Sequence, residues 1–238
     1  MSATRETAIV AGSHIYPLGT RVNERGHLEV GGCDVVELAA EFGTPLYVYA
    51  EQDIRARARE YLSAFRARTA DFEVLYASKA APLTAIYRIC AEEGLSVDVA
   101  SGGELHMALR AGTPPERLYL HGNNKTEAEL RYAVEAGIGH VIVDSFAEMA
   151  RLDALLDRPQ DVLIRVTPGI LPSTHSYVQT GGLDSKFGFG LEDGLAAERS
   201  RRSASRATCA WWGFTPTSGR RSSNWSHTPR RSRPSRSS

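Results

Sequence analysis

The sequence predicts an α/β protein: an incomplete (β/α)8 barrel of about five strand–helix units with an irregular C-terminal tail. Two observations predict this fold. From Phe72 onward, short apolar runs rich in β-forming residues alternate with helix-like stretches. Three of those stretches open on the pattern S/T-x-x-E, which marks the first turn of a helix. Strands separated by single helices pair in parallel, through right-handed crossovers.

Five strands are expected, at residues 73–76, 95–99, 117–120, 140–143 and 162–166. The first intervening helix, 83–93, has Pro82 near its first turn and Gly94 just past its end, which is the usual placement of these residues. The next helix spans about 103–111, and two more end near Ala136 and Leu156. We expect these three later helices to be capped by Ser101, Thr126 and Ser145, each followed three residues later by a Glu that can reach back to the cap residue.

Two folds fit this alternation, a (β/α)8 barrel and an open doubly wound sheet. No G-x-G-x-x-G follows any of the strands, which disfavours a dinucleotide-binding sheet. The barrel is therefore preferred. A complete barrel needs roughly 250 residues, so only part of one fits here.

Residues 1–50 differ from the rest and are expected to form an entry segment that packs outside the barrel. Residues 15–30 are polar, with turn signals at Gly19 and Gly26. A helix is expected at 35–42, ending at Gly43, and an alternating strand at 45–49. A long helix at 51–68 opens the partial barrel, which we assign to residues 51–198.

Charge divides the chain into two parts. The chain has 28 Lys and Arg and 28 Asp and Glu, but residues 199–238 hold ten Arg, no Lys and no acid. Residues 1–198 therefore carry 18 basic and 28 acidic residues, a net charge of −10. An acidic body argues against a nucleic-acid partner. The three cysteines show no metal or disulfide spacing, so we expect no metal site and a cytoplasmic location. No apolar run predicts a membrane partner.

Polar residues follow the predicted strands, and catalytic groups of parallel barrels gather at these strand ends. Lys79 follows the first strand, where its amine could serve Schiff-base chemistry or simply be solvated. Asp98 and His121 follow the next two, and His121 could equally satisfy a loop backbone. Arg165 lies inside an apolar strand and so needs a partner such as an anionic cofactor or a carboxylate.

Several motifs then match a family in order and spacing. They are Tyr-Ala-Ser-Lys-Ala at 76–80, the run 96–104, His-Gly-Asn-Asn-Lys at 121–125, and the paired stretches 175–181 and 184–189. They resemble the diaminopimelate decarboxylases, which are pyridoxal-phosphate (PLP) enzymes. The last pair separates the chain from the ornithine and arginine decarboxylases. The resemblance covers about 12–194.

The resemblance implies an alanine-racemase-like, PLP-binding barrel. Lys79 would carry the PLP, with Asp98 near the barrel mouth and Arg165 near the cofactor. A loop containing His175, Tyr177, Thr180 and Lys186 would cover the site. The implied reaction is decarboxylation of meso-2,6-diaminopimelate to L-lysine, an amino-acid substrate in lysine biosynthesis, by a homodimer.

Residues 199–238 form a Ser/Arg-rich tail that departs from the family, and we expect it to be disordered. Tryptophan has a single codon, so Trp211 and Trp212 constrain the underlying bases. Read one base earlier than the codon of Trp211, these bases permit Leu-Val-Gly-Leu-His-Ala-His-Ile-Gly-Ser, which resembles the sixth-strand motif His-x-His-Ile-Gly-Ser-Gln of the family. We therefore interpret the tail as out of frame, with the frame change near Glu198.

This interpretation predicts that the fifth strand has an unpaired edge and that the chain is truncated, poorly folded and inactive. Two alternatives remain. One is a non-catalytic PLP-binding barrel, which would not need the stretch 175–189. The other is an RNA-binding tail, whose Arg and Trp could contact bases, although it has no repeats.

Overall fold

A computed structural model describes residues 15–167, 188–190 and 209–216. Its main sheet contains five parallel strands in chain order, joined by helices. The strands are β4 (Leu75–Ala77), β5 (Ser96–Val99), β6 (Leu118–Leu120), β7 (His140–Val143) and β8 (Gln160–Thr167). The connecting helices are α4 (Thr84–Glu93), α5 (Gly102–Arg110), α6 (Glu127–Ala136) and α7 (Phe146–Leu155). This arrangement confirms the predicted partial barrel.

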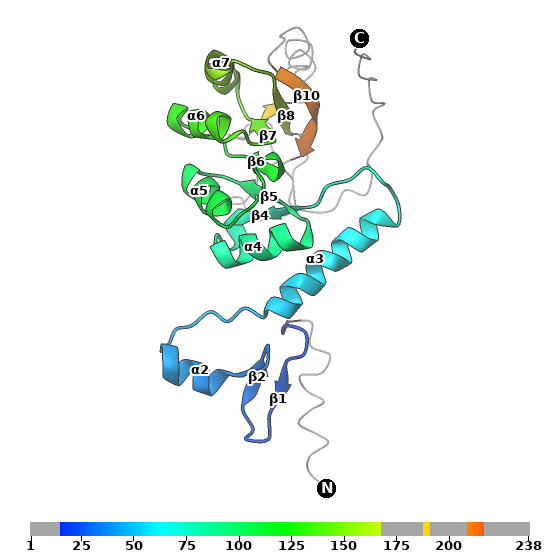
Figure 1. Cartoon of the computed structure of the whole chain (residues 1–238), viewed down its shortest axis with the longest axis vertical. Helices are drawn as coiled ribbons and strands as arrows, with labels where there is room; N and C mark the ends of the chain where they lie inside the picture. The colour runs from blue at the N-terminus through cyan, green and yellow to red at the C-terminus, as the bar shows by residue number, and fades with distance from the viewer. Residues whose placement is uncertain (1–14, 168–187, 191–208, 217–238) are drawn as a thin grey trace.

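Helices α4 to α7 stack along one side of the sheet (Figure 1). Between these two layers lies a continuous apolar core, to which alternate residues of every strand contribute. Val97, Leu120 and Val141 come from the strands, and Leu105 and Leu130 come from the helices; all five are fully buried. Burying one such side chain contributes about 1.5–3 kcal/mol, so this layer provides most of the stability of the strand–helix units.

The strand register identifies the residues that share the opposite, inner face of the sheet. Ala77 pairs with Asp98, Asp98 with Tyr119, Tyr119 with His140, and His140 with Asp161. The rings of Tyr119 and His140 stack with their centroids 4.3 Å apart. The inner face is therefore much more polar than the helix-covered face, which suits a face that lines a barrel interior near a site.

The edge of β8 differs from the expectation. Strand β10 (Cys209–Pro216) pairs with β8 in parallel, with a register shift between Trp211 and Phe214. The short β9 (Phe189–Gly190) also pairs with the end of β8. The prediction that the fifth strand has an unpaired edge is wrong, because part of the tail supplies the backbone partner. The rest of the tail lies outside the described residues.

Serine or threonine caps begin three of the helices, as predicted. Ser101, Thr126 and Ser145 each accept a bond from the backbone N–H three residues later. A complete capping box forms only at Thr126, where Glu129 also accepts from the N–H of the cap residue. In the other two helices the Glu side chain accepts from the residue before the cap, Ala100 or Asp144. These two Glu side chains therefore bind the backbone N–H one residue before the cap residue, and not that of the cap residue itself as predicted.

The entry segment is a separate small unit. Its strands β1 (Arg21–Val22), β2 (Leu28–Val30) and β3 (Cys33–Asp34) form an antiparallel sheet, followed by α2 (Val35–Phe42). Helix α3 (Glu51–Arg66) leads from this unit to the main sheet (Figure 1). The helix predicted at 35–42 is confirmed, and the predicted end at Gly43 is its C-cap.

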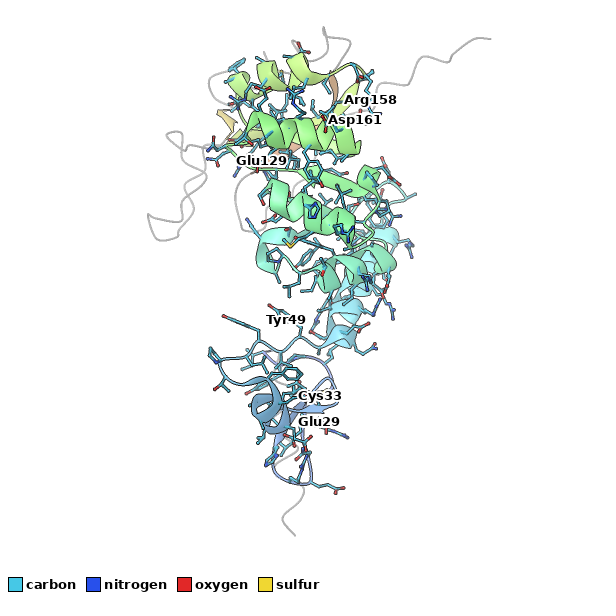
Figure 2. All side chains as sticks on the ribbon, turned by 60° about the vertical axis from the view of Figure 1, so that its left-hand side comes forward. Glu29, Cys33, Tyr49, Glu129, Arg158 and Asp161 are labelled. Carbon is cyan, nitrogen blue, oxygen red and sulfur yellow. The ribbon has the colours of Figure 1, made fainter. Side chains whose placement is uncertain are left out.

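The predicted strand at 45–49 is wrong. Residues 46–50 form no strand, and Tyr47 is 88% exposed. An alternating pattern needs a neighbouring strand to form a ladder, and none pairs with these residues in the described structure. Figure 2 shows Tyr49 in the stretch between the entry segment and the helices of the main sheet.

Candidate functional site

Lys79 lies directly after β4, in the 3-10 turn η1 (Ser78–Ala80), and is exposed. Its neighbours fix the turn. The hydroxyls of Ser78 and Tyr87 are 2.6 Å apart and buried, and the hydroxyl of Tyr76 donates to the carbonyl of Ala81 at 3.1 Å. These hydrogen bonds fix the turn and leave the primary amine of Lys79 accessible, and such an amine can react with a carbonyl compound. The role predicted for Lys79 stays a prediction.

Asp98 lies within β5, one residue before its end, and His121 lies beside it at the end of the next strand. His121 comes directly after β6 and donates its backbone N–H to the carbonyl of Val99 at 2.8 Å. Its Nδ1 lies 3.3 Å from the Asp98 carboxylate. The Nε2 atom is buried and has no hydrogen-bond partner in the described structure. A carboxylate on Nδ1 favours the tautomer that is protonated there, so Nε2 is left as an acceptor.

Arg165 extends from β8 and forms an ion pair with Asp144, the residue directly after β7. The distance from Nη1 to Oδ1 is 3.1 Å, and the Asp144 side chain is only 3% exposed. The second oxygen, Oδ2, accepts from the N–H of Gly188 at 3.2 Å. Of the two kinds of partner predicted for Arg165, an anionic cofactor or a carboxylate, the carboxylate is therefore present within the chain.

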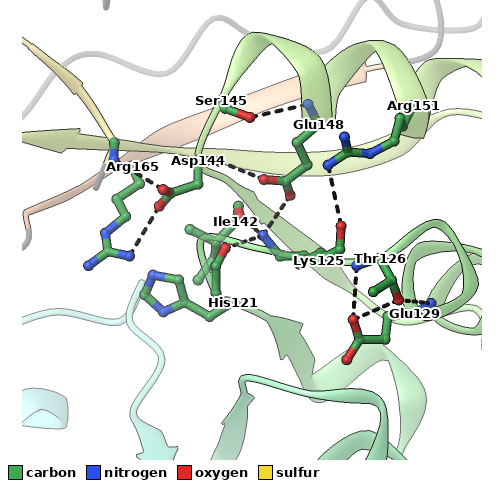
Figure 3. Close-up of polar contacts among 12 residues, drawn as sticks. His121, Lys125, Thr126, Glu129, Ile142, Asp144, Ser145, Glu148, Arg151 and Arg165 are labelled. Atoms are coloured by element: carbon green, nitrogen blue, oxygen red, sulfur yellow. Dashed lines mark hydrogen bonds and ion pairs between the residues drawn. The ribbon is translucent and has the colours of Figure 1, made fainter. Parts of the chain in front are cut away.

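A second ion pair lies beside the first (Figure 3). The Lys125 ammonium donates to Glu148 at 2.6 Å, and to the carbonyls of Gly122 and Ile142 at 2.7 Å each. Glu148 in turn accepts from the backbone N–H of Asp144 at 3.1 Å. Burial lowers the pKa of Lys125 and raises that of Glu148, and the attraction between the two charges opposes both shifts.

The sequence does not indicate that Lys125 and Glu148 are partners. In the sequence, Glu148 is the capping Glu that follows Ser145, and Lys125 ends the His-Gly-Asn-Asn-Lys run at 121–125. Lysine is rarely fully buried without a partner, and nothing local in the sequence shows that Lys125 is buried. Only the approach of α7 to the end of β6 brings the two residues together.

The other four predicted site residues belong to the loop predicted to cover the site. His175, Tyr177, Thr180 and Lys186 lie outside the described residues. Within the described residues, no group of His, Cys, Asp and Glu could hold a metal ion, and no helix has the length and hydropathy that a bilayer crossing requires. A cavity of about 340 Å³ lies among residues of α6, α7 and the turn after α7, away from the strand ends.

Comparison with known proteins identifies the family. Residues 51–207 match the family model described as the pyridoxal-binding domain of pyridoxal-dependent decarboxylases. The chain is 52% identical over 195 residues to a diaminopimelate decarboxylase from Actinosynnema pretiosum, covering 82% of this chain and 43% of that protein. It is 49% identical over 178 residues to the Bacillus subtilis enzyme, covering 74% of this chain and 40% of the relative.

A solved structure agrees with these matches. The diaminopimelate decarboxylase of M. jannaschii, in complex with L-lysine, superposes with a TM-score of 0.73 at 31% identity, covering 83% of this chain and 47% of that one. The chain thus spans less than half the length of the relatives it matches. It belongs to the pyridoxal-dependent decarboxylase family, within which it corresponds to the N-terminal, pyridoxal-binding part of a diaminopimelate decarboxylase.

Proposed function

We propose that this chain is the cofactor-binding part of a cytoplasmic enzyme that decarboxylates meso-2,6-diaminopimelate to L-lysine, and that Lys79 carries the PLP. The observation that supports this most strongly is the position of Lys79. Its exposed amine follows β4 at the C-terminal edge of a parallel sheet. Asp98, His121, Asp144 and Arg165 lie at the same edge.

The described residues fit PLP. The cofactor needs an accessible amine for its aldehyde, which Lys79 offers, and cationic or hydrogen-bonding groups for its anionic atoms. Arg165 is one such cation. The buried His121 Nε2, which has no partner among the described residues, is an acceptor for a protonated atom of the cofactor or substrate. When bound, PLP supplies an electron sink for the pair left on the α-carbon as carbon dioxide departs. In this proposal Asp98 orients the His121 ring, and Arg165 binds an anionic group of cofactor or substrate.

We propose that turnover also requires the remaining length of the relatives, which span more than twice the matched region. Recognition of the distal end of the substrate and assembly into a homodimer belong to that part of the proposal. The 238-residue chain alone is then expected to bind cofactor with little or no turnover. The non-catalytic PLP-binding barrel remains the alternative for the whole protein.

The first test is to incubate the purified chain with PLP, reduce with borohydride, and locate the pyridoxyl group by mass spectrometry. We expect the label on Lys79, and nearly complete loss of label from that peptide in Lys79→Ala. Lys125 is an internal control, because its buried ammonium already donates three bonds and should stay unlabelled. Label spread over several lysines would contradict the assigned site.

A second measurement separates the two functions. Carbon dioxide release from meso-diaminopimelate is followed for the chain alone, and for the chain mixed with the remaining part of a relative. Release that depends on both parts and on Lys79 supports the decarboxylase. Cofactor attachment without release in the complete assembly would favour the non-catalytic alternative.

A further inference from the structure

We propose that Asp144 is a positioning residue, which holds the Arg165 guanidinium against the inner face of the sheet so that it can bind an anion. The inference rests on the proposed function, because the anion would belong to the cofactor or the amino-acid substrate. Asp144 itself would touch neither molecule. It would act only through Arg165.

Burial of Asp144 is the first observation. Its side chain is 3% exposed, and a buried carboxylate is costly unless it is paired and hydrogen-bonded. Each oxygen has its own donor: Oδ1 accepts from Arg165 Nη1, and Oδ2 accepts from the N–H of Gly188. The backbone N–H of Asp144 is bound by Glu148, which is held by Lys125 (Figure 3). Glu148 therefore holds the backbone of Asp144, while Arg165 and Gly188 hold its carboxylate.

Strand register explains why an acid at this position meets Arg165. Val143 pairs with Ile164, and both are fully buried on the face opposite to that of His140 and Asp161. The next residue on each strand, Asp144 and Arg165, therefore points to the inner face, and the two lie side by side. The charge pair is thus set by the backbone of two adjacent strands.

Gly188 completes the arrangement. Its φ is +70°, and a Cβ placed there would lie 2.7 Å from the carbonyl oxygen of Arg165. Only glycine permits this approach, which brings the Gly188 N–H to Asp144 and continues into β9 beside β8. Asp144 therefore binds both the side chain of Arg165 and the backbone of Gly188, and Gly188 itself lies against the backbone of Arg165.

The consequence for binding is preorganisation. An arginine side chain loses considerable conformational freedom when it orders around an anion. With Nη1 already bonded to a buried carboxylate, part of that loss has occurred before binding. Removing the Asp144 charge should therefore weaken anion binding through Arg165, without removing any group that touches the ligand.

The experiment compares Asp144→Asn, Arg165→Met and the double variant in the full chain. The matched control is Asp161→Asn, another aspartate on the inner face. It lies at the opposite strand end, beside Arg158 and away from Glu129 (Figure 2). The PLP dissociation constant is measured for each variant. We expect Asp144→Asn to raise it roughly tenfold or more, as for loss of a charged hydrogen bond, and to change it less than about twofold when Arg165 is already Met. Additive effects of the two substitutions would overturn the proposal.

Two readouts on the cofactor-free chain make the test independent of PLP. Hydrogen exchange of the Gly188 amide and rotation of the Arg165 guanidinium, both followed by NMR, should accelerate about tenfold in Asp144→Asn and stay unchanged in Asp161→Asn. If the chain fails to bind PLP while these contacts behave as expected, the proposed function fails and the Asp144 contacts stand. Wild-type exchange and rotation rates in a folded Asp144→Asn chain would overturn the positioning role.

Discussion

Two ion pairs in this molecule have the same length and different exposure to water. Lys125 and Glu148 lie 2.6 Å apart with both side chains 2% exposed. Arg59 and Glu93, which join α3 to α4, also lie 2.6 Å apart, but Arg59 is 63% exposed and only Glu93, at 8%, is largely covered. Distance alone would rank them equally. Water screens the second pair and not the first, so their contributions to stability should differ severalfold.

The comparison shows where the fold tolerates the loss of a charged side chain least. Each proton of the Lys125 ammonium has an acceptor, and these acceptors lie on the loop after β6, on β7 and on α7. The network between α3 and α4 joins two helices at the surface, where Arg55 also binds Glu51, Glu92 and Glu93. The buried pair therefore holds the strand ends that carry the candidate site, and the exposed network sets how α3 lies on α4.

The largest expected effect is that of Lys125→Met. Removing one member leaves Glu148 buried without its charge partner, which should destabilise the chain by about 3–5 kcal/mol. Urea unfolding followed by circular dichroism measures the loss. Arg131→Met, which breaks the exposed helical pair with Glu127, is the control and should cost less than about 0.5 kcal/mol. A Lys125→Met effect as small as that of the control would remove the distinction between the networks.

A double substitution sharpens the same comparison. Lys125→Met combined with Glu148→Leu removes both charges, so no unpaired carboxylate remains. The double variant should recover much of the stability lost in Lys125→Met. If it does not, the larger cost comes from the carbonyls of Gly122 and Ile142, which lose their Lys125 donor in both variants.

An intermediate effect is expected one residue away, at Thr126. This residue is exposed, but its hydroxyl accepts from the N–H of Glu129 at 3.2 Å and completes the capping box of α6. Thr126→Ala should cost about 1 kcal/mol in the same unfolding experiment. Thr84→Ala is the matched control, because Thr84 opens α4, whose cap residue makes no side-chain bond. Equal losses in the two variants would argue against a capping contribution.

The smallest effect belongs to the exposed network and depends on pH. Hydrogen bonds from Arg59 and Arg55 lower the pKa of Glu93 from 4.5 to about 2. A lowered folded-state pKa contributes stability above pH 4.5, which is lost as pH falls toward 2. Glu93→Gln should therefore be less stable than the wild type at pH 7 and indistinguishable from it near pH 2. At roughly 1 M salt the difference at pH 7 should shrink. A difference independent of pH would contradict this origin.

Local signals in the sequence predicted the strand–helix order well. The hydroxyls of Ser101, Thr126 and Ser145 cap as expected because the first turn of a helix contains both partners. The strand predicted at 45–49 failed because alternation describes one strand and says nothing of the neighbour it needs. The position of Lys79 after a strand could also be predicted, because the strand and the lysine are adjacent in sequence.

Contacts between strands could not be predicted in the same way. The pairing of Arg165 with Asp144 depends on the register of β7 against β8, which no pattern within either strand specifies. The same holds for Lys125 and Glu148, which are 23 residues apart in sequence. The need for a partner was evident at Arg165, where a charge interrupts an apolar run, but its identity was not.

The pairing of β10 with β8 shows that the backbone of a strand and its side chains are specified with different stringency by the gene. Under the shifted reading, the bases that encode residues 210–218 also permit Leu-Val-Gly-Leu-His-Ala-His-Ile. Ladder bonds use the N–H and C=O groups that nearly every residue carries, so a strand can be accepted at this edge from either reading frame. Only one of the two frames would bring imidazoles to that position. A frame change here could therefore preserve the backbone architecture of the next strand while erasing its chemistry.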